Sequence, residues 1–182
     1  NLRSLNMAKT AREESPLAVH VFGSDPDIMA EAARIGESLG AAIIDINMGC
    51  PQRKVVKNRA GAALMRDEAL AARIIERIVK AVSIPVSVKI RLGWNNKSIN
   101  ATRIAMAAQD SGAAMVTVHA RTRSQMFSGK ADWSAIREIK NAISIPIIAN
   151  GDIQDPGDAR LCLEVSGADG IMIGRGVLGR PW

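Results

Sequence analysis

The amino-acid sequence predicts an α/β fold, and within that class a (β/α)8 TIM barrel of which these 182 residues supply about six of the eight units. Three observations lead to this prediction. Short β-branched apolar runs alternate with longer segments of helical period. Each run is apolar on both faces, as expected for parallel strands covered by helices. Every run also ends in polar residues, and only a barrel brings all its strand ends to one site.

The apolar runs define the predicted strands in order. They cover residues 17–21, 42–46, 86–90, 115–118, 147–149 and 170–173. A complete barrel has eight strands and typically runs to roughly 250 residues. We therefore expect residues 1–182 to be one partial barrel domain, a fragment of a longer enzyme.

Helices are predicted between the strands because the intervening segments begin at capping residues. The candidate caps are Ser24-Asp25-Pro26, Asp67, Asp132 and Asp155-Pro156. Gly40 stands where the first helix needs a left-handed residue at its end. The turns before two strands also repeat, as Ser83-Ile84-Pro85 and Ser144-Ile145-Pro146. Such repeats are typical of helix-to-strand turns on the stabilising face of a barrel.

Composition excludes several classes of protein. Hydrophobic residues make up 47% and charged residues 23% of the chain, which is ordinary for one compact domain. No apolar run reaches the roughly 18 residues that a membrane-spanning helix needs, and residues 1–10 lack the pattern of a signal peptide. A cytoplasmic protein is expected. Two cysteines and two histidines at these spacings form neither a disulfide framework nor a zinc site.

The net charge of +6 comes from 24 Lys and Arg against 18 Asp and Glu, and the excess is clustered. Two segments without any acidic residue carry it. They hold Arg53, Lys54, Lys57, Arg59 and Arg66, and then Arg121, Arg123 and Lys130. Such local positive fields suit a polyanion such as nucleic acid, although a solvated basic loop would have the same composition.

Cys50 is the first candidate for chemistry. It lies between Gly49 and Pro51 where a predicted strand ends, so the loop should present its thiol. As a nucleophile it would act as thiolate, whereas as a proton donor it would act as thiol, and the residues leave both roles open. Cys162 lies in an apolar helical stretch and is expected in the core.

The later strand ends predict an anion site. Asn150-Gly151-Asp152 and Gly174-Arg175-Gly176 follow consecutive late strands, where barrels commonly bind phosphate through backbone N–H groups. Lys89 ends an apolar strand and needs an acceptor or a path to water. His119 is placed similarly, and a structural histidine is the alternative.

Several long segments in register resemble the tRNA-dihydrouridine synthases, particularly their bacterial B-type branch. The segments are 45–51, 54–55, 60–64, 88–94, 117–123, 149–153 and 172–176, with the chain ending in Pro181-Trp182. The resemblance implies an FMN enzyme that reduces the 5,6 double bond of uridine in tRNA, with NADPH or NADH as electron donor. Hydride from the flavin would add to carbon 6, and Cys50 would donate the proton to carbon 5.

The resemblance also implies roles for individual residues. His20 and Lys89 would contact the flavin ring, Asn150, Gly151 and Asp152 the ribityl-phosphate region, and Gly174 and Arg175 the phosphate. Asn47, His119 and Arg121 would be ring or substrate contacts. As a further hypothesis, Arg53, Lys54 and Lys57 meet tRNA phosphates beside the entering base. No metal and no membrane are implied, and a monomer is expected.

The sequence departs from the family pattern in three respects. His20 stands where the family usually has glutamine, and this changes the polar group at the flavin edge. The two N-terminal strands with a proline-methionine-alanine-glycine flavin loop are missing, as is the C-terminal helical domain. Three alternative functions are considered: an FMN enzyme acting on a free pyrimidine, an RNA-binding remnant without catalysis, and a phosphate-binding barrel without flavin.

Overall fold

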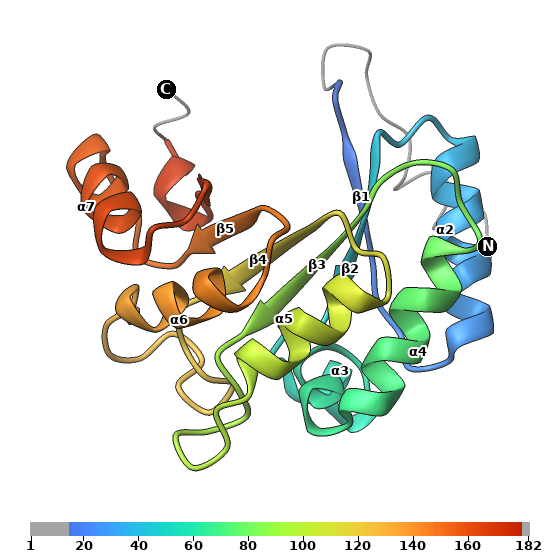
Figure 1. Ribbon diagram of the computed structural model, residues 1–182, viewed down its shortest axis with the longest axis horizontal. Coiled ribbons are helices and arrows are strands. Elements are labelled where there is room, and N and C mark those ends of the chain that lie inside the picture. Colours follow the sequence, from blue (N-terminus) through green and yellow to red (C-terminus); the bar gives the residue numbers. More distant parts are fainter. Residues whose placement is uncertain (1–14, 180–182) are drawn as a thin grey trace.

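A computed structural model describes residues 15–179 of the chain. Within them, six parallel strands form one sheet (Figure 1). The strands are β1 (Ala18–Val21), β2 (Ile43–Asn47), β3 (Val86–Arg91), β4 (Met115–His119), β5 (Ile147–Asn150) and β6 (Gly170–Met172). Each lies within one residue of the predicted bounds, so the predicted strands are confirmed.

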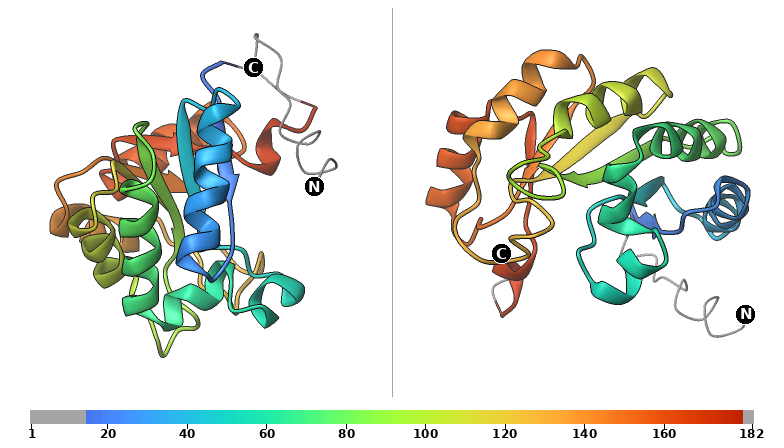
Figure 2. Two further views of the ribbon diagram at one scale, coloured as in Figure 1. Left: turned by 90° about the vertical axis from the view of Figure 1, so that its right-hand side faces the viewer. Right: turned by 90° about the horizontal axis from the view of Figure 1, so that it is seen from below.

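The strand order is β1-β2-β3-β4-β5-β6, with every strand parallel to its neighbour. A doubly wound sheet would reverse this order at a switch point, so the order excludes that fold. The sheet curves, and the helices lie along its outer side (Figure 2). Among the described residues, β1 pairs only with β2 and β6 only with β5. The predicted α/β class and incomplete barrel are therefore confirmed.

The helices on the outer side start largely where the capping residues predicted. They are α2 (Pro26–Ser38), α4 (Glu68–Val79), α5 (Ala101–Asp110), α6 (Ser134–Ala142) and α7 (Pro156–Ser166). Asp25, Asp67 and Asp155 each accept backbone N–H groups of the first turn. Ser24 is not a cap, because its hydroxyl donates to the carbonyl of Asn58. Gly40 has the expected positive φ of 92°.

The core lies between the helices and the outward side of the sheet. Ile44, Ile46, Val88 and Val116 point to this side and are fully buried, packed with α4 residues such as Ile74. The strands were expected to be apolar on both faces, but only this helix-facing side is apolar. On the inner side, the alternate positions toward the carboxyl ends of the strands are mostly polar, namely Asp45, Asn47, Ser87, Lys89, Arg91, Thr117, His119 and Asn150. This inner face is therefore equipped for binding rather than for packing.

The repeated Ser-Ile-Pro turns have one stabilising contact in common. Glu37 of α2 accepts from the backbone N–H and hydroxyl of Ser83 through one carboxylate oxygen. Gln109 of α5 accepts from the same two groups of Ser144 through its amide oxygen. In each case the helix before one strand holds the turn that begins the next strand. Among residues 15–179, no helix is long and apolar enough to cross a membrane.

Candidate active site

The strand register brings the predicted polar residues together at the carboxyl end of the sheet. His20 pairs with Asp45, and Asp45 with Ser87. Four residues beyond Ser87 on β3, Arg91 pairs with His119, and His119 pairs with Asn150. Because side chains alternate along a strand, all of these residues point to the inner face.

A cavity of about 540 Å³ lies at these strand ends. This volume falls within the roughly 300–1,000 Å³ range of small-molecule and cofactor sites. Eight of the predicted site residues line it: Lys89, His119, Arg121, Asn150, Gly151, Asp152, Gly174 and Arg175. His20, Asn47, Cys50 and the three basic residues Arg53, Lys54 and Lys57 are not among its lining residues.

Lys89 is held at the cavity by an amide. Its Nζ donates to Oδ1 of Asn150 at 3.0 Å, and Nδ2 of Asn150 donates to the Met172 carbonyl at 2.8 Å. Burial lowers the pKa of Lys89 to about 8, with the positive charge of Arg91 acting in the same direction and Asp45 against it. The β3 strand thus delivers a positive charge that is only partly compensated, as an anionic or carbonyl-bearing ligand would need.

His119 is an uncharged imidazole. Burial lowers its pKa to about 3, and the nearby cations Arg91, Lys89 and Arg121 contribute. Nη1 of Arg121 lies 3.4 Å from Nε2 of His119. A guanidinium can only donate, so Nε2 is the acceptor and the ring proton lies on Nδ1. His119 can therefore offer a hydrogen bond without adding charge to the cavity.

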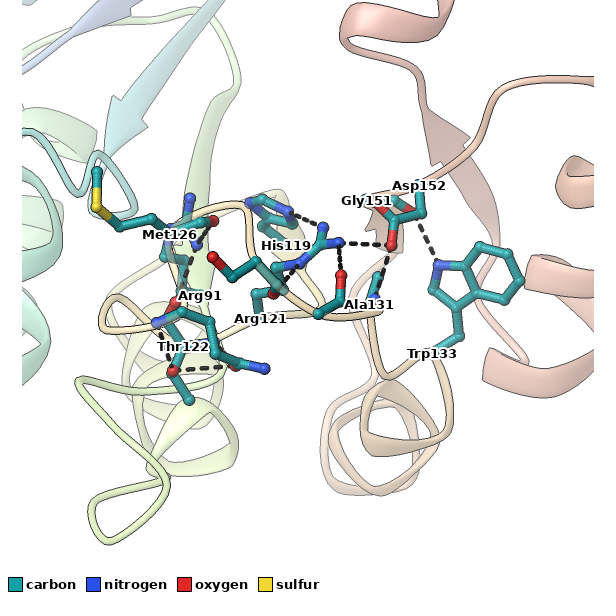
Figure 3. Close-up of polar contacts among 12 residues, drawn as sticks. Arg91, His119, Arg121, Thr122, Met126, Ala131, Trp133, Gly151 and Asp152 are labelled. Carbon is teal, nitrogen blue, oxygen red and sulfur yellow. Dashed lines mark hydrogen bonds and ion pairs between the residues drawn. The ribbon is translucent and has the colours of Figure 1, made fainter.

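Arg121 connects the loop after β4 with the loop after β5 (Figure 3). Its side chain is 2% exposed and its Nη2 donates at 2.6 Å both to Oδ2 of Asp152 and to the Gly129 carbonyl. Burial alone would raise the pKa of Asp152, but hydrogen bonds from the Ala131 N–H and from Arg121 keep it below its ordinary value. These contacts commit Arg121 to holding His119 and Asp152 in place.

Gly151 occupies a position that a larger residue would not tolerate. Its φ is 115°, and a Cβ there would lie 2.8 Å from Cδ2 of His119. Its carbonyl accepts from Nε1 of Trp133 at 2.8 Å (Figure 3). Asp152 also has a positive φ, of 57°. The Asn-Gly-Asp turn therefore brings backbone against the imidazole.

The backbone of Cys50 is fixed from both sides. Oδ1 of Asn47 accepts from the N–H groups of Gly49 and Cys50, at 3.1 and 2.9 Å. The Cys50 carbonyl accepts from Ala62 at 3.0 Å, and the thiol-bearing residue is half-buried. Gly61, with φ 60°, allows this approach, since a Cβ there would lie 2.8 Å from the Cys50 carbonyl oxygen. Asn47 therefore uses its amide oxygen to shape the loop that presents Cys50.

Arg91, the last residue of β3, also holds the Cys50 loop in place. It was not among the candidate site residues predicted from the sequence. Its Nε donates to the Gly49 carbonyl at 2.7 Å, and its Nη1 donates to the carbonyls of Thr122 and Met126 at 3.0 and 2.9 Å (Figure 3). Burial lowers its pKa to about 10. The spacing could have identified it, because Arg91 is two residues after Lys89 in the same strand and therefore points to the same inner face.

His20 belongs to a short hydrogen-bonded chain. Its Nδ1 lies 2.5 Å from Oδ2 of Asp45, and Oδ1 of Asp45 accepts from the Ser87 hydroxyl at 2.6 Å. The His20 side chain is 42% exposed whereas Asp45 is buried. The Asp45 carboxylate orients the His20 imidazole through Nδ1, and Nε2 has no partner among the described side chains.

The predicted basic loop contains a short helix, α3 (Arg53–Lys57), followed by the 3-10 helix η2 (Gly61–Arg66). α3 has no buried residue, and Arg53, Lys54 and Lys57 are exposed. Within residues 15–179, none of the three forms an ion pair. The three side chains present positive charge to solvent beside the Cys50 loop.

Comparison with known proteins identifies the family of this chain. A family model described as Dihydrouridine synthase (Dus) matches residues 1–182. The chain belongs to the dihydrouridine synthase family. A protein of Rickettsia prowazekii named "Probable tRNA-dihydrouridine synthase" is 57% identical over 164 residues, which is 90% of this chain and 50% of the relative. The "tRNA-dihydrouridine synthase B" of Pseudomonas aeruginosa is 48% identical over 170 residues, 93% of this chain and 51% of the relative.

The chain spans about half the length of the curated relatives it matches. Among solved structures, a dipeptide epimerase from Enterococcus faecalis V583 superimposes with a TM-score of 0.61 at 18% identity, over 86% of this chain and 39% of that chain. At this identity the likeness concerns the fold alone. Within the part of the chain that the structure describes, no group of His, Cys, Asp and Glu could hold a metal ion.

Proposed function

We propose that this protein is a tRNA-dihydrouridine synthase that reduces uridine to 5,6-dihydrouridine in tRNA, with FMN as cofactor and NADPH or NADH as electron source. The observation that carries the proposal is Cys50, held on a rigid loop beside a cationic cavity in a chain of the dihydrouridine synthase family. The relatives bearing that name support the substrate class.

The chemistry of the donor set fits FMN. Lys89 and Arg175 bring positive charge to the cavity, and Asn150 and Asp152 bring polar groups. Gly174 precedes the 3-10 helix η3 (Arg175–Val177), and a Cβ built on it meets nothing within 4 Å, which leaves room for a phosphate against backbone N–H groups. These residues with Gly151 would hold the cofactor, with His20 at the ring edge. When bound, FMN supplies the hydride that adds to carbon 6 of the uracil.

Cys50 would then complete the reduction. As hydride arrives at carbon 6, negative charge develops at carbon 5 and the adjacent carbonyl, and the thiol of Cys50 delivers a proton to carbon 5. The Cys50 loop is held by Asn47 and Arg91, so the thiol is positioned before the substrate enters. Neutral His119, which lines the cavity, offers a hydrogen bond to the bound base without adding charge.

The exposed cations fit an RNA substrate. A target base must leave its stack to reach the cavity, which costs a few kcal/mol and least where RNA is already open. In the proposal, Arg53, Lys54 and Lys57 bind phosphates flanking this base. The helix α3 follows directly from the Cys50 loop, so these contacts would lie next to the reacting uridine.

The test replaces Cys50 by alanine in the flavin-loaded protein, with unmodified tRNA as substrate. Cys50→Ala should retain bound flavin and its reduction by NADPH while dihydrouridine formation falls by at least about 100-fold, the range expected for loss of a general acid. Cys162→Ala, at the chain's other cysteine, is the control and should retain uridine reduction. Retained turnover in Cys50→Ala would refute its role, and faster turnover of free uracil or orotate than of tRNA would refute the substrate.

A further inference from the structure

Three strand-end loops meet at one tryptophan beside the cavity. The guanidinium carbon of Arg66, at the end of η2, lies 4.8 Å from the ring centroid of Trp94, and that of Arg123 lies 4.6 Å from it. Trp94 follows β3 and Arg123 follows β4. These loops and α3 lie at the same end of the molecule, seen from below in Figure 2.

The position of this Arg66–Trp94–Arg123 stack is fixed by backbone hydrogen bonds. The N–H of Arg123 donates to the Gly93 carbonyl at 2.8 Å, and that of Ser124 donates to the Trp94 carbonyl at 2.9 Å. Trp94 itself is half-buried. The ring therefore serves as a rigid support, and a guanidinium stacked on it loses little further freedom when it binds a ligand.

Neither arginine of the stack has an acidic partner among residues 15–179. The nearest acids in sequence are engaged elsewhere, Asp67 with Arg59 at 3.8 Å and Glu68 with Arg103 at 2.9 Å. Nε of Arg123 is buried without any hydrogen-bond partner. The two guanidinium groups at one ring repel each other, and a bound anion would relieve this repulsion.

A polar hollow of about 510 Å³ adjoins the stack. Its lining residues are Asn95, Asn96, Lys97, Thr122, Ser124 and Gln125, which are the neighbours of Trp94 and Arg123 in the same two loops. Every lining residue carries a polar or charged side chain. Its amide, hydroxyl and ammonium groups match the hydrogen-bonding groups of a sugar-phosphate backbone.

We propose that the Arg66–Trp94–Arg123 stack, with the adjoining hollow, is a second RNA contact that binds the backbone on one side of the target uridine. The proposal rests on the proposed function, since it takes the tRNA substrate as given. RNA is favoured over an acidic protein because the stack and α3 place cations on neighbouring strand-end loops at one end of the molecule, as a repeating polyanion requires. A guanidinium supported on a ring can bind phosphate at its N–H edge or stack on an unpaired base.

The experiment measures binding of an unmodified tRNA transcript to the flavin-loaded protein over a range of salt concentrations. Arg66→Gln removes one phosphate contact from an exposed side chain, so affinity should fall roughly 5- to 20-fold and the slope of log K against log salt should lose about 0.7–0.9. Trp94→Leu keeps both arginines but removes the ring that supports their guanidinium groups. The affinity for tRNA should therefore fall with little change in the slope of log K against log salt. The control is Arg160→Gln, at an exposed arginine of α7 that forms no ion pair with residues 15–179, and it should change neither quantity.

Flavin content and NADPH oxidation are measured on the same samples, and both should equal those of the parent protein. Unchanged tRNA affinity and slope in Arg66→Gln and Trp94→Leu would overturn the proposal, as would absence of tRNA binding by the parent protein. Equal weakening of poly-aspartate binding would assign the stack to acidic proteins and would also overturn it. If the parent binds tRNA through the stack but forms no dihydrouridine, only the proposed function fails.

Discussion

His119 shows how the residues around one side chain determine its charge. Burial and three nearby cations hold its pKa at about 3, far below the ordinary value of 6.5. Between these two pH values the unfolded chain binds a proton that the folded chain does not bind. The folded state therefore loses stability as pH falls through this window, and the contribution is fully present above about pH 6.5.

This linkage predicts a pH-dependent difference between the parent and His119→Gln. From pH 7 to pH 5 the parent should lose about 2 kcal/mol more of its free energy of unfolding than the variant, which has no imidazole to protonate. Urea unfolding at the two pH values measures this. Parallel losses in the two proteins would mean that His119 is protonated in the folded state at pH 5.

Gly151 gives a second prediction at the scale of one residue. Gly151→Ala should destabilise the fold by well over the roughly 1 kcal/mol that a left-handed alanine costs, because its Cβ would meet His119 at 2.8 Å. Gly40→Ala is the matched control, since Gly40 has φ 92° but nothing within 4 Å of a Cβ. Thermal or urea unfolding of both variants compares the costs, and equal costs would contradict the close approach to His119.

At the scale of elements, the repeated Ser-Ile-Pro turns are held by unlike residues in the same role. Glu37 and Gln109 both accept a serine N–H and hydroxyl through one side-chain oxygen. What the turn requires is therefore an acceptor at this helical position and not a charge. The contact joins successive βα units at the end of the sheet opposite the cavity, so it stabilises the barrel without entering the site.

This contact can be tested at Gln109. Gln109→Ala removes the acceptor for Ser144 and leaves its donors to water, so we expect a loss of about 1–3 kcal/mol in the free energy of unfolding. Gln109→Glu keeps the oxygen and copies Glu37, so it should retain most of the stability. Chemical denaturation measures the free energy of unfolding of both variants. Equal losses would show that the amide NH2 or the packing of Gln109 stabilises the turn, and not its oxygen.

For the whole molecule, the sequence predicted the strands closely because parallel strands leave a strong apolar signal on their helix-facing side. It missed the short helix α3, in which no residue is buried and whose basic residues are exposed. At the site, it named eight residues that line the cavity. It could not foresee that Arg91, from β3, binds carbonyls of the loops after β2 and β4, because such contacts depend on how the loops fold back.

The cavity is lined by residues that follow several strands, so a ligand bound there should stabilise the molecule as a unit. Binding to the folded state alone adds about 2.7 kcal/mol at a ligand concentration of 100 times Kd. We expect FMN to raise the melting temperature more than riboflavin does, because only FMN carries the phosphate that Gly174 and Arg175 are proposed to hold. Thermal unfolding of the chain with equal concentrations of each flavin measures this difference.

Arg175→Gln makes the expectation specific to the proposed phosphate site. The guanidinium of Arg175 lies 4.6 Å from the ring centroid of Phe127, which holds an otherwise exposed side chain at the cavity wall. Without this charge, FMN should stabilise the folded protein by at most about 1 kcal/mol more than riboflavin does. In Arg160→Gln the difference between the two flavins should equal that of the parent protein. An undiminished advantage in Arg175→Gln would place the phosphate elsewhere. Equal stabilisation of the parent by both flavins would mean that the cavity recognises the ring and ribityl chain alone.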